Sequence, residues 1–167
     1  MRNLEIKVKI EHGDEIRDRL SFAKHYGTRE QVDTYYLLGE RRLKIREEKM
    51  RSEIILYMRK LENGTRESTY YRIVIPQRFL KFMKSTLHFL CGTKVIVEKV
   101  RDLYTYKNTR IHLDIVAHLG VFIELETVVQ DEKDDRKYEE EHEEVKRRLS
   151  LSVYPTIAGS YSDLFGE

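Results

Sequence analysis

The chain has 167 residues, which fits one domain spanning 1–167, and its formal net charge is only +2. Charged residues make up 36% and apolar residues 40%, with two prolines and eight glycines, which excludes disordered and collagen-like classes. No apolar run approaches the roughly 18 residues of a transmembrane helix, and the segment MRNLEIKVKIE alternates charged with apolar residues and does not resemble the apolar region of a signal peptide. The single cysteine, Cys91, excludes an internal disulfide. We therefore expect a cytoplasmic protein, and the mild charge balance does not indicate a nucleic-acid binder.

Most of the chain carries apolar residues at every second position, which is the spacing of β-strands. This pattern predicts eight strands, over residues 3–10, 32–38, 41–47, 53–60, 68–75, 94–103, 109–116 and 121–129. Hairpin-length or helix-length connections between them indicate antiparallel pairing. We therefore expect a mainly β (α+β) fold: a closed eight-stranded antiparallel β-barrel with no exposed edges, and helices packed on its outside.

Residues 12–26 change to helical spacing, with Asp14 as the expected N-cap and Gly27 as the expected stop. The expected buried stripe of this helix is Ile16, Leu20 and Ala23.

A second helix is predicted over 76–91, because Pro76 suits a helix start and Gly92 follows its end. The highly charged segment 131–149 keeps a thin apolar stripe, which predicts a third helix laid on the surface. An acidic interaction tail is the alternative for that segment.

Charged residues recur at every second position on the polar faces of the strands, where Thr, Ser and Gln are more usual. The charged faces are Asn3-Glu5-Lys7-Lys9, Arg42-Lys44-Arg46, Lys99-Arg101, Arg110-His112-Asp114 and Glu124-Glu126. Two arrangements are open on periodicity alone. The charges either cover the outside of an apolar-filled barrel, or they line its interior while the helices cover an apolar outer face. An interior of this kind cannot remain unpaired, because isolated buried charge is very costly.

A charged interior predicts a polyanion balanced by cations. Arg and Lys suit phosphate oxygens, and clustered carboxylates suit a hard divalent cation. The motifs point the same way. The segment NLEIKVK (3–9) resembles the E-x-E-x-K motif of the CYTH superfamily, the triphosphate tunnel metalloenzymes, with Asn3 in place of the first Glu. This superfamily includes class IV adenylate cyclases, thiamine triphosphatases and inorganic triphosphatases. The resemblance continues in order through QVDTYY, LKIRE, ILYMRK, YYRI, VEKVR, RIHLDIVAHLGVFIELE and SYSDLF.

The resemblance implies a tunnel that binds a triphosphate-containing small molecule together with Mg²⁺ or Mn²⁺. The implied metal ligands are Asn3, Glu5, Asp114, Glu124 and Glu126. The implied phosphate-binding residues are Lys7, Lys9, Lys44, Arg46, Arg59, Arg72, Lys99, Arg101 and Arg110. Of these, we expect Lys7, Arg46, Lys99 and Arg101 to act catalytically, by offsetting charge that develops in phosphoryl transfer. No nucleic-acid or membrane partner is expected, and the chain is expected to be a monomer or a homodimer.

Three functions remain open. Hydrolysis of an organic or inorganic triphosphate ranks first, because no adenine-pocket motif is evident. A class IV adenylate cyclase, making cyclic AMP and pyrophosphate from ATP, is the second. A non-catalytic module that binds polyphosphate is the third, because Asn3 removes one carboxylate from the motif.

Overall fold

A computed structural model describes residues 2–39, 41–62, 65–131 and 134–165, except for the side chains of 2, 41 and 57–70. Its sheet contains eight strands: β1 (Arg2–Ile10), β2 (Lys24–Leu38), β3 (Arg41–Glu48), β4 (Arg51–Glu62), β5 (Thr65–Ile75), β6 (Thr93–Tyr106), β7 (Thr109–Val116) and β8 (Gly120–Val129). All eight expected strands are therefore present, and several extend beyond their expected bounds.

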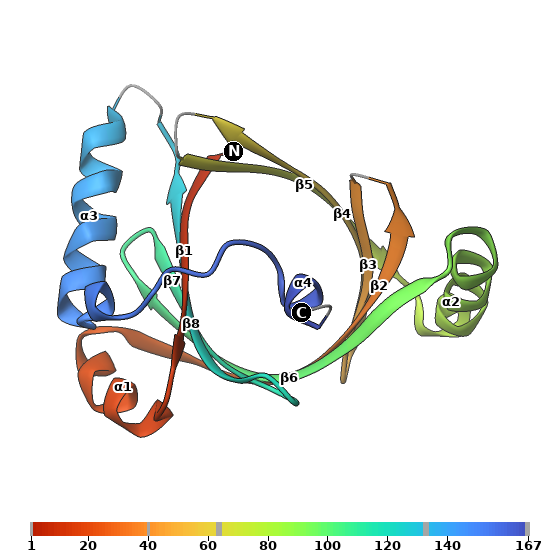
Figure 1. Cartoon of the computed structure of the whole chain (residues 1–167), viewed down its shortest axis with the longest axis horizontal. Helices are drawn as coiled ribbons and strands as arrows, with labels where there is room; N and C mark the ends of the chain where they lie inside the picture. Colours follow the sequence, from red (N-terminus) through yellow and green to blue (C-terminus); the bar gives the residue numbers. More distant parts are fainter. Residues whose placement is uncertain (1, 40, 63–64, 132–133, 166–167) are drawn as a thin grey trace.

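The strands pair antiparallel in the order β1-β8-β7-β6-β2-β3-β4-β5, and the sheet curls round a central space (Figure 1). The two end strands, β1 and β5, approach each other with Cα atoms within 8 Å. In the described part of the chain, no hydrogen-bonded pairing joins them. The antiparallel eight-stranded sheet is thus confirmed, whereas its closure into a barrel is not.

The helical segments are α1 (Gly13–Arg19), η1 (Leu20–Phe22), α2 (Gln77–Cys91), α3 (Asp135–Arg148), η3 (Leu151–Val153) and α4 (Tyr161–Leu164). The expected helices at 76–91 and within 131–149 are confirmed as α2 and α3. None of the helices in the described ranges is long and apolar enough to cross a membrane.

The helix expected over 12–26 is too long, because helical structure stops at Phe22 and β2 begins at Lys24. His12 precedes the first helical residue, and Asp14 lies in the first turn instead of at the N-cap. Gly27 lies in β2 at a shift in the register with β6, where its φ of 123° suits glycine. Pairing with β6 therefore overrides the local helical spacing.

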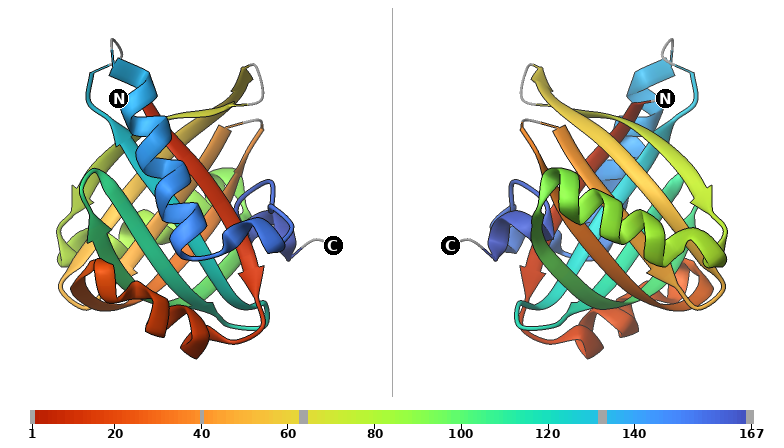
Figure 2. Two further views of the ribbon diagram at one scale, coloured as in Figure 1. Left: turned by 90° about the vertical axis from the view of Figure 1, so that its left-hand side faces the viewer. Right: turned by 90° about the vertical axis from the view of Figure 1, so that its right-hand side faces the viewer.

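The main apolar core lies outside the curled sheet. The outward side chains of β1, β7 and β8 pack against α1, η1 and α3, and Ile111, Ile123 and Leu125 are completely buried there. A second cluster lies between β2–β5 and α2 (Figure 2). Because strand side chains alternate between faces, the charged faces point inward. The arrangement with charges inside is the one that the chain adopts.

Candidate active site in the cavity of the sheet

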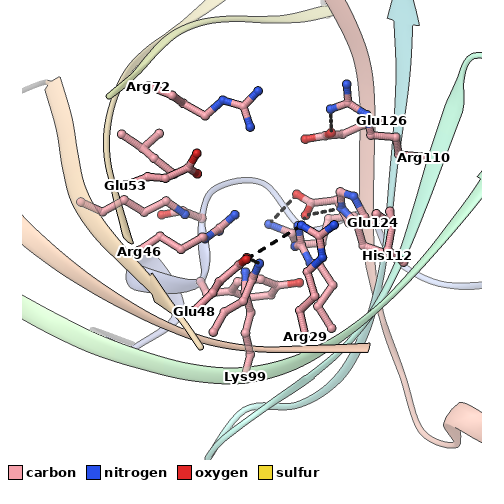
Figure 3. A pocket seen from close by; sticks show the side chains of 18 of the residues that line it. Arg29, Arg46, Glu48, Glu53, Arg72, Lys99, Arg110, His112, Glu124 and Glu126 are labelled. Carbon is pink, nitrogen blue, oxygen red and sulfur yellow. Dashed lines mark hydrogen bonds and ion pairs between the residues drawn. The ribbon is translucent and has the colours of Figure 1, made fainter. Parts of the chain in front are cut away.

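The charged faces surround a cavity of about 420 Å³, to which all eight strands contribute. Its lining includes nine Lys and Arg residues and five Glu residues, an excess of positive charge that suits a polyanion. The basic residues are Lys7, Arg29, Lys44, Arg46, Arg51, Arg72, Lys99, Arg101 and Arg110, and the acidic ones are Glu5, Glu48, Glu53, Glu124 and Glu126. Figure 3 shows several of these side chains pointing into the same space from opposite walls.

Asp33, from β2, forms ion pairs with three basic residues, Lys44, Arg46 and Lys99. It is completely buried, and it accepts hydrogen bonds from Lys44 Nζ at 2.8 Å and from Arg46 Nε and a terminal guanidinium nitrogen at 2.7 and 2.8 Å. Lys99 Nζ lies 3.6 Å away. Burial alone would raise the pKa of Asp33, but the attraction of Lys44, Arg46 and Lys99 outweighs it and holds that pKa well below its usual range. Asp33 is therefore a fixed negative charge behind the wall.

Asp114, from β7, has the corresponding role for Arg101. The guanidinium donates two bonds to this carboxylate, at 2.6 and 2.5 Å, and Tyr161 donates a third at 2.8 Å. Lys99 Nζ lies 3.8 Å from Asp114, so Lys99 sits between the two buried aspartates. Burial would raise the pKa of Asp114, but Arg101 and Lys99 lower it overall. The two hydrogen bonds to Asp114 fix the guanidinium of Arg101, which also lines the cavity.

Glu124, from β8, forms ion pairs with Lys7 of β1 and Arg101 of β6. Its carboxylate lies 3.2 Å from Lys7 Nζ and 3.0 Å from a terminal nitrogen of Arg101. His112 Nδ1 is 3.5 Å from the same carboxylate, too long for a good hydrogen bond. Burial would raise the pKa of Glu124, but Lys7 and the neighbouring His112 and Arg101 keep it well below its usual range. Glu124 is therefore committed to ion pairs in this conformation.

Glu5 and Glu126 are directly opposite each other across the β1–β8 ladder, and both line the cavity. Like charges in this position destabilise a sheet unless a cation balances them. Arg110 supplies one, at 3.3 Å from Glu126.

Mg²⁺ is commonly held by one or two carboxylates, with substrate phosphates and water completing its shell. Asn3, two residues before Glu5, is completely buried, and both polar atoms of its side chain lack a hydrogen-bond partner among the described residues. This donor set fits a hard divalent cation, although no three His, Cys, Asp or Glu side chains in the described ranges converge as a preformed cluster.

The C-terminal segment lies at one open end of the curled sheet, where α4 stands beyond the ends of the strands (Figure 2). The backbone N–H of Ile157 donates to the carbonyl of Lys7 at 2.8 Å, and Lys7 Nζ lies 4.2 Å from the centre of the Tyr161 ring. Arg42, from β3, binds both Ser160 and Asp163. These contacts fix Tyr161 and Ser160 as part of the lining.

The profile of the CYTH domain matches residues 1–161. The chain belongs to the CYTH family. It is 27% identical to the putative adenylate cyclase MJ0240 of Methanocaldococcus jannaschii, over 99% of both chains. The PH1012 protein of Pyrococcus horikoshii OT3 has the same fold, with a TM-score of 0.81 and 21% identity over 98% of this chain and 99% of that one. A putative adenylate cyclase from Vibrio parahaemolyticus has a TM-score of 0.76 and 16% identity over 100% and 99% of the two chains.

The chain is thus a CYTH-type enzyme, of the triphosphatase or cyclase kind. The CYTH structure brings ten of the residues expected from the sequence to the cavity wall. They are Glu5, Lys7, Lys44, Arg46, Arg72, Lys99, Arg101, Arg110, Glu124 and Glu126.

Three expected residues with described side chains do not appear in the lining, and the side chain of a fourth lies outside the described part. Lys9 shares a strand face with Lys7, but its side chain is exposed. Asp114 lies behind Arg101 with its oxygens engaged, which argues against a direct role as metal ligand. Asn3 is completely buried, at the position two residues before Glu5 in β1. Arg59 lies outside the described side chains.

Other residues of the site were not expected from the sequence. Asp33, behind the wall, lies within QVDTYY, where an acidic residue among strand-forming ones was the available signal. Tyr161 lies in the SYSDLF ending, where no strand pattern indicates a role. Tyr35 and His112, which were not among the expected site residues, also line the cavity.

Lys99 gives the site a pH dependence. Burial, assisted by Arg101, lowers its pKa to about 8 from the ordinary 10.5. A bound polyanion favours the charged form of Lys99. Above pH 8 the neutral Lys99 must therefore take up a proton from solvent when the polyanion binds. We expect the affinity for inorganic triphosphate to fall as the pH rises from about 8 toward 10.5. Calorimetric titration across this range measures it, and Lys99→Arg should remove the fall. An equal fall in both proteins would assign it to another group.

Proposed function

We propose that this CYTH enzyme binds a triphosphate-containing substrate together with Mg²⁺ or Mn²⁺ in the cavity and hydrolyses it. The observation that carries the proposal is the pair of buried carboxylates, Asp33 and Asp114, behind the wall. Together they fix Lys44, Arg46, Lys99 and Arg101 before any substrate arrives. Electrostatic stabilisation is strongest where the charges are already oriented in a site that excludes water.

The proposed roles follow from position. Lys7, Arg46, Lys99 and Arg101 bind the phosphate oxygens and offset the negative charge on the leaving group. Lys44, Arg72 and Arg110 extend the same positive wall. In hydrolysis, water adds to the terminal phosphorus, the bond from that phosphorus to the bridging oxygen breaks, and the diphosphate leaves with that oxygen. The water's second proton goes to solvent or to the released phosphate.

Glu5 and Glu126 would hold the divalent ion, with the Asn3 amide oxygen as an additional donor. When bound, the ion supplies Lewis-acid polarisation of phosphate oxygens. Glu124 instead keeps Lys7 and Arg101 in place through its two ion pairs.

A cyclase is the second candidate, because the Methanocaldococcus relative named a putative adenylate cyclase matches along its whole length. Cyclisation would use the same phosphate cradle, with a ribose 3′-hydroxyl attacking the α-phosphorus and pyrophosphate leaving. A non-catalytic polyphosphate-binding module is the third candidate, and the orphaned Asn3 amide is the observation behind it.

A substrate panel separates the three functions. Inorganic triphosphate, thiamine triphosphate and ATP are incubated with Mg²⁺ or Mn²⁺, and phosphate, pyrophosphate and cyclic nucleotide are measured. We expect metal-dependent phosphate release. Cyclic AMP with pyrophosphate would show the cyclase, and binding without products would show the module.

Lys7 and Lys9 provide a matched pair for the same assay, because they share one strand face and only Lys7 lines the cavity. Lys7→Ala should lower kcat/KM by about 10²-fold, and Lys9→Ala should change it by less than about threefold. Equal effects of the two substitutions would place the reaction elsewhere.

A further inference from the structure

The helix α2 is only half covered by the sheet. Its inward stripe of Leu80, Met83, Leu87 and Cys91 packs on the outer face of β2–β5, yet no residue of α2 is fully buried. The far more charged α3 buries four of its residues against the same sheet. An amphipathic helix normally buries its apolar stripe. The coverage of α2 is therefore incomplete in a single copy of the chain.

A second apolar stripe follows one flank of α2. Phe79, Phe82, Phe89 and Leu90 are 47%, 67%, 88% and 67% exposed. At 100° per residue these four positions fall on one side of the helix, next to the inward stripe. Large aromatic side chains are costly to leave in water over a whole helix length.

The exposed apolar surface continues from α2 onto the sheet. Tyr71 and Ile73, on the outer face of β5, are 63% and 64% exposed, and their register partners on β4 pack under α2. Leu37 is 56% exposed and its N–H donates to the Gly92 carbonyl at the end of α2. We call these residues the α2 patch: Leu37, Tyr71, Ile73, Phe79, Phe82, Phe89 and Leu90.

The area of the α2 patch matches what one partner contributes to a stable interface. With about 200 Å² for a whole aromatic side chain and about 150 Å² for Leu or Ile, the exposed fractions amount to roughly 800 Å², the standard contribution per partner. The largest apolar patch of an ordinary monomer is roughly 300–600 Å². The α2 patch thus exceeds what a monomer usually exposes.

We propose that a second copy of this chain covers the α2 patch, in a two-fold symmetric dimer with the two α2 helices antiparallel. The apolar stripe runs along the helix axis, so the same surface can face itself across a two-fold axis. Antiparallel packing also sets Arg78 and Lys81, near the start of one α2, against the negative C-terminal end of the other. This dimer does not depend on the chemistry inside the cavity.

An anionic membrane is the competing partner, because α2 carries Arg78, Lys81 and Lys84 and no acidic residue. Two observations favour a second copy instead. Lys84 is already paired with Glu47, at 2.5 Å. The α2 patch also spreads sideways over β2 and β5, whereas a helix lying in a lipid surface needs apolar area only along itself.

Sedimentation velocity tests the proposal. At about 100 μM the wild-type chain should be a dimer, because interfaces of this size have micromolar or tighter affinity. Phe82→Glu with Phe89→Glu should raise the dissociation constant at least 30-fold. Val153→Glu, a substitution at a residue 75% exposed on η3, is the matched control and should leave the dimer intact.

A monomeric wild-type chain, or a double variant that dimerises as tightly as the wild type, would overturn the proposal. So would binding of a monomeric chain to phosphatidylserine vesicles that requires Phe82 and Phe89. If the double variant does not fold, hydrogen exchange of the wild type decides. Exchange at α2 and β5 should slow as the protein concentration rises, and no dependence on concentration would contradict the dimer.

Discussion

Asp33→Asn is expected to reduce the free energy of unfolding by about 3–5 kcal/mol, the usual cost of breaking a buried ion pair from one side. The substitution keeps the shape of the side chain and removes its charge. Lys44, Arg46 and Lys99 would then be crowded together without the carboxylate that all three face. Urea unfolding followed by circular dichroism measures the loss.

Two controls make this result specific. Asp18→Asn, at an exposed position on α1, should change stability by less than about 0.5 kcal/mol. Adding Lys44→Met to Asp33→Asn removes one excess cation and should recover part of the loss. Inorganic triphosphate should also stabilise the Asp33→Asn protein more than the wild type, because it supplies the missing negative charge. An Asp33→Asn protein as stable as the wild type would show that Asp33 does not hold the cations in place.

Glu126→Gln and Glu5→Gln are each expected to lower the metal-dependent rate by roughly 10²–10³-fold, as removal of one electrostatic contact in an active site does. Each amide keeps an oxygen donor and loses the charge that a hard cation prefers. The apparent Mn²⁺ requirement should rise in both variants, and titration of Mn²⁺ against the reaction rate measures it.

Glu124→Gln is the informative comparison, because Glu124 is already paired with Lys7 and Arg101. It should lose stability as well as activity, while its Mn²⁺ requirement should change less than in the other two variants. If Glu124→Gln alone shifts the Mn²⁺ titration, the metal is held further along β8 than we propose. If none of the three shifts it, these carboxylates do not hold a catalytic metal.

The alternation of the strands made most of this fold predictable. Leu4-Glu5-Ile6-Lys7-Val8 fixes which side chains share a face, but it cannot say which face is inside. The apolar stripes of the helices decide that, because they need an apolar surface to cover. The length of the helix at 12–26 was overestimated, because a glycine such as Gly27 occurs both at helix ends and at irregularities in a strand. Long-range pairing with β6 places Gly27 at such an irregularity in β2. Sheet closure also depends on long-range geometry between β1 and β5, which no local pattern encodes.

The site was predictable only where a residue lies on a charged strand face. Lys7, Arg46, Arg101 and Asp114 follow from that pattern, whereas Asp33 does not. The role of Asp114 was not predictable, because the sequence cannot tell a carboxylate that meets a ligand from one that holds an arginine behind the cavity wall. Tyr161 reaches the cavity from the C-terminal segment, so its place depends on tertiary contacts such as that of Lys7 with Ile157.

A crystal structure of the protein with inorganic triphosphate and Mn²⁺ tests the central claim most directly, because anomalous scattering locates the metal independently of the phosphates. We predict the triphosphate inside the cavity, in contact with Lys7, Arg46, Lys99 and Arg101, with Mn²⁺ on Glu5 and Glu126. Triphosphate bound outside the curled sheet, or an empty cavity at saturating ligand, would contradict the account.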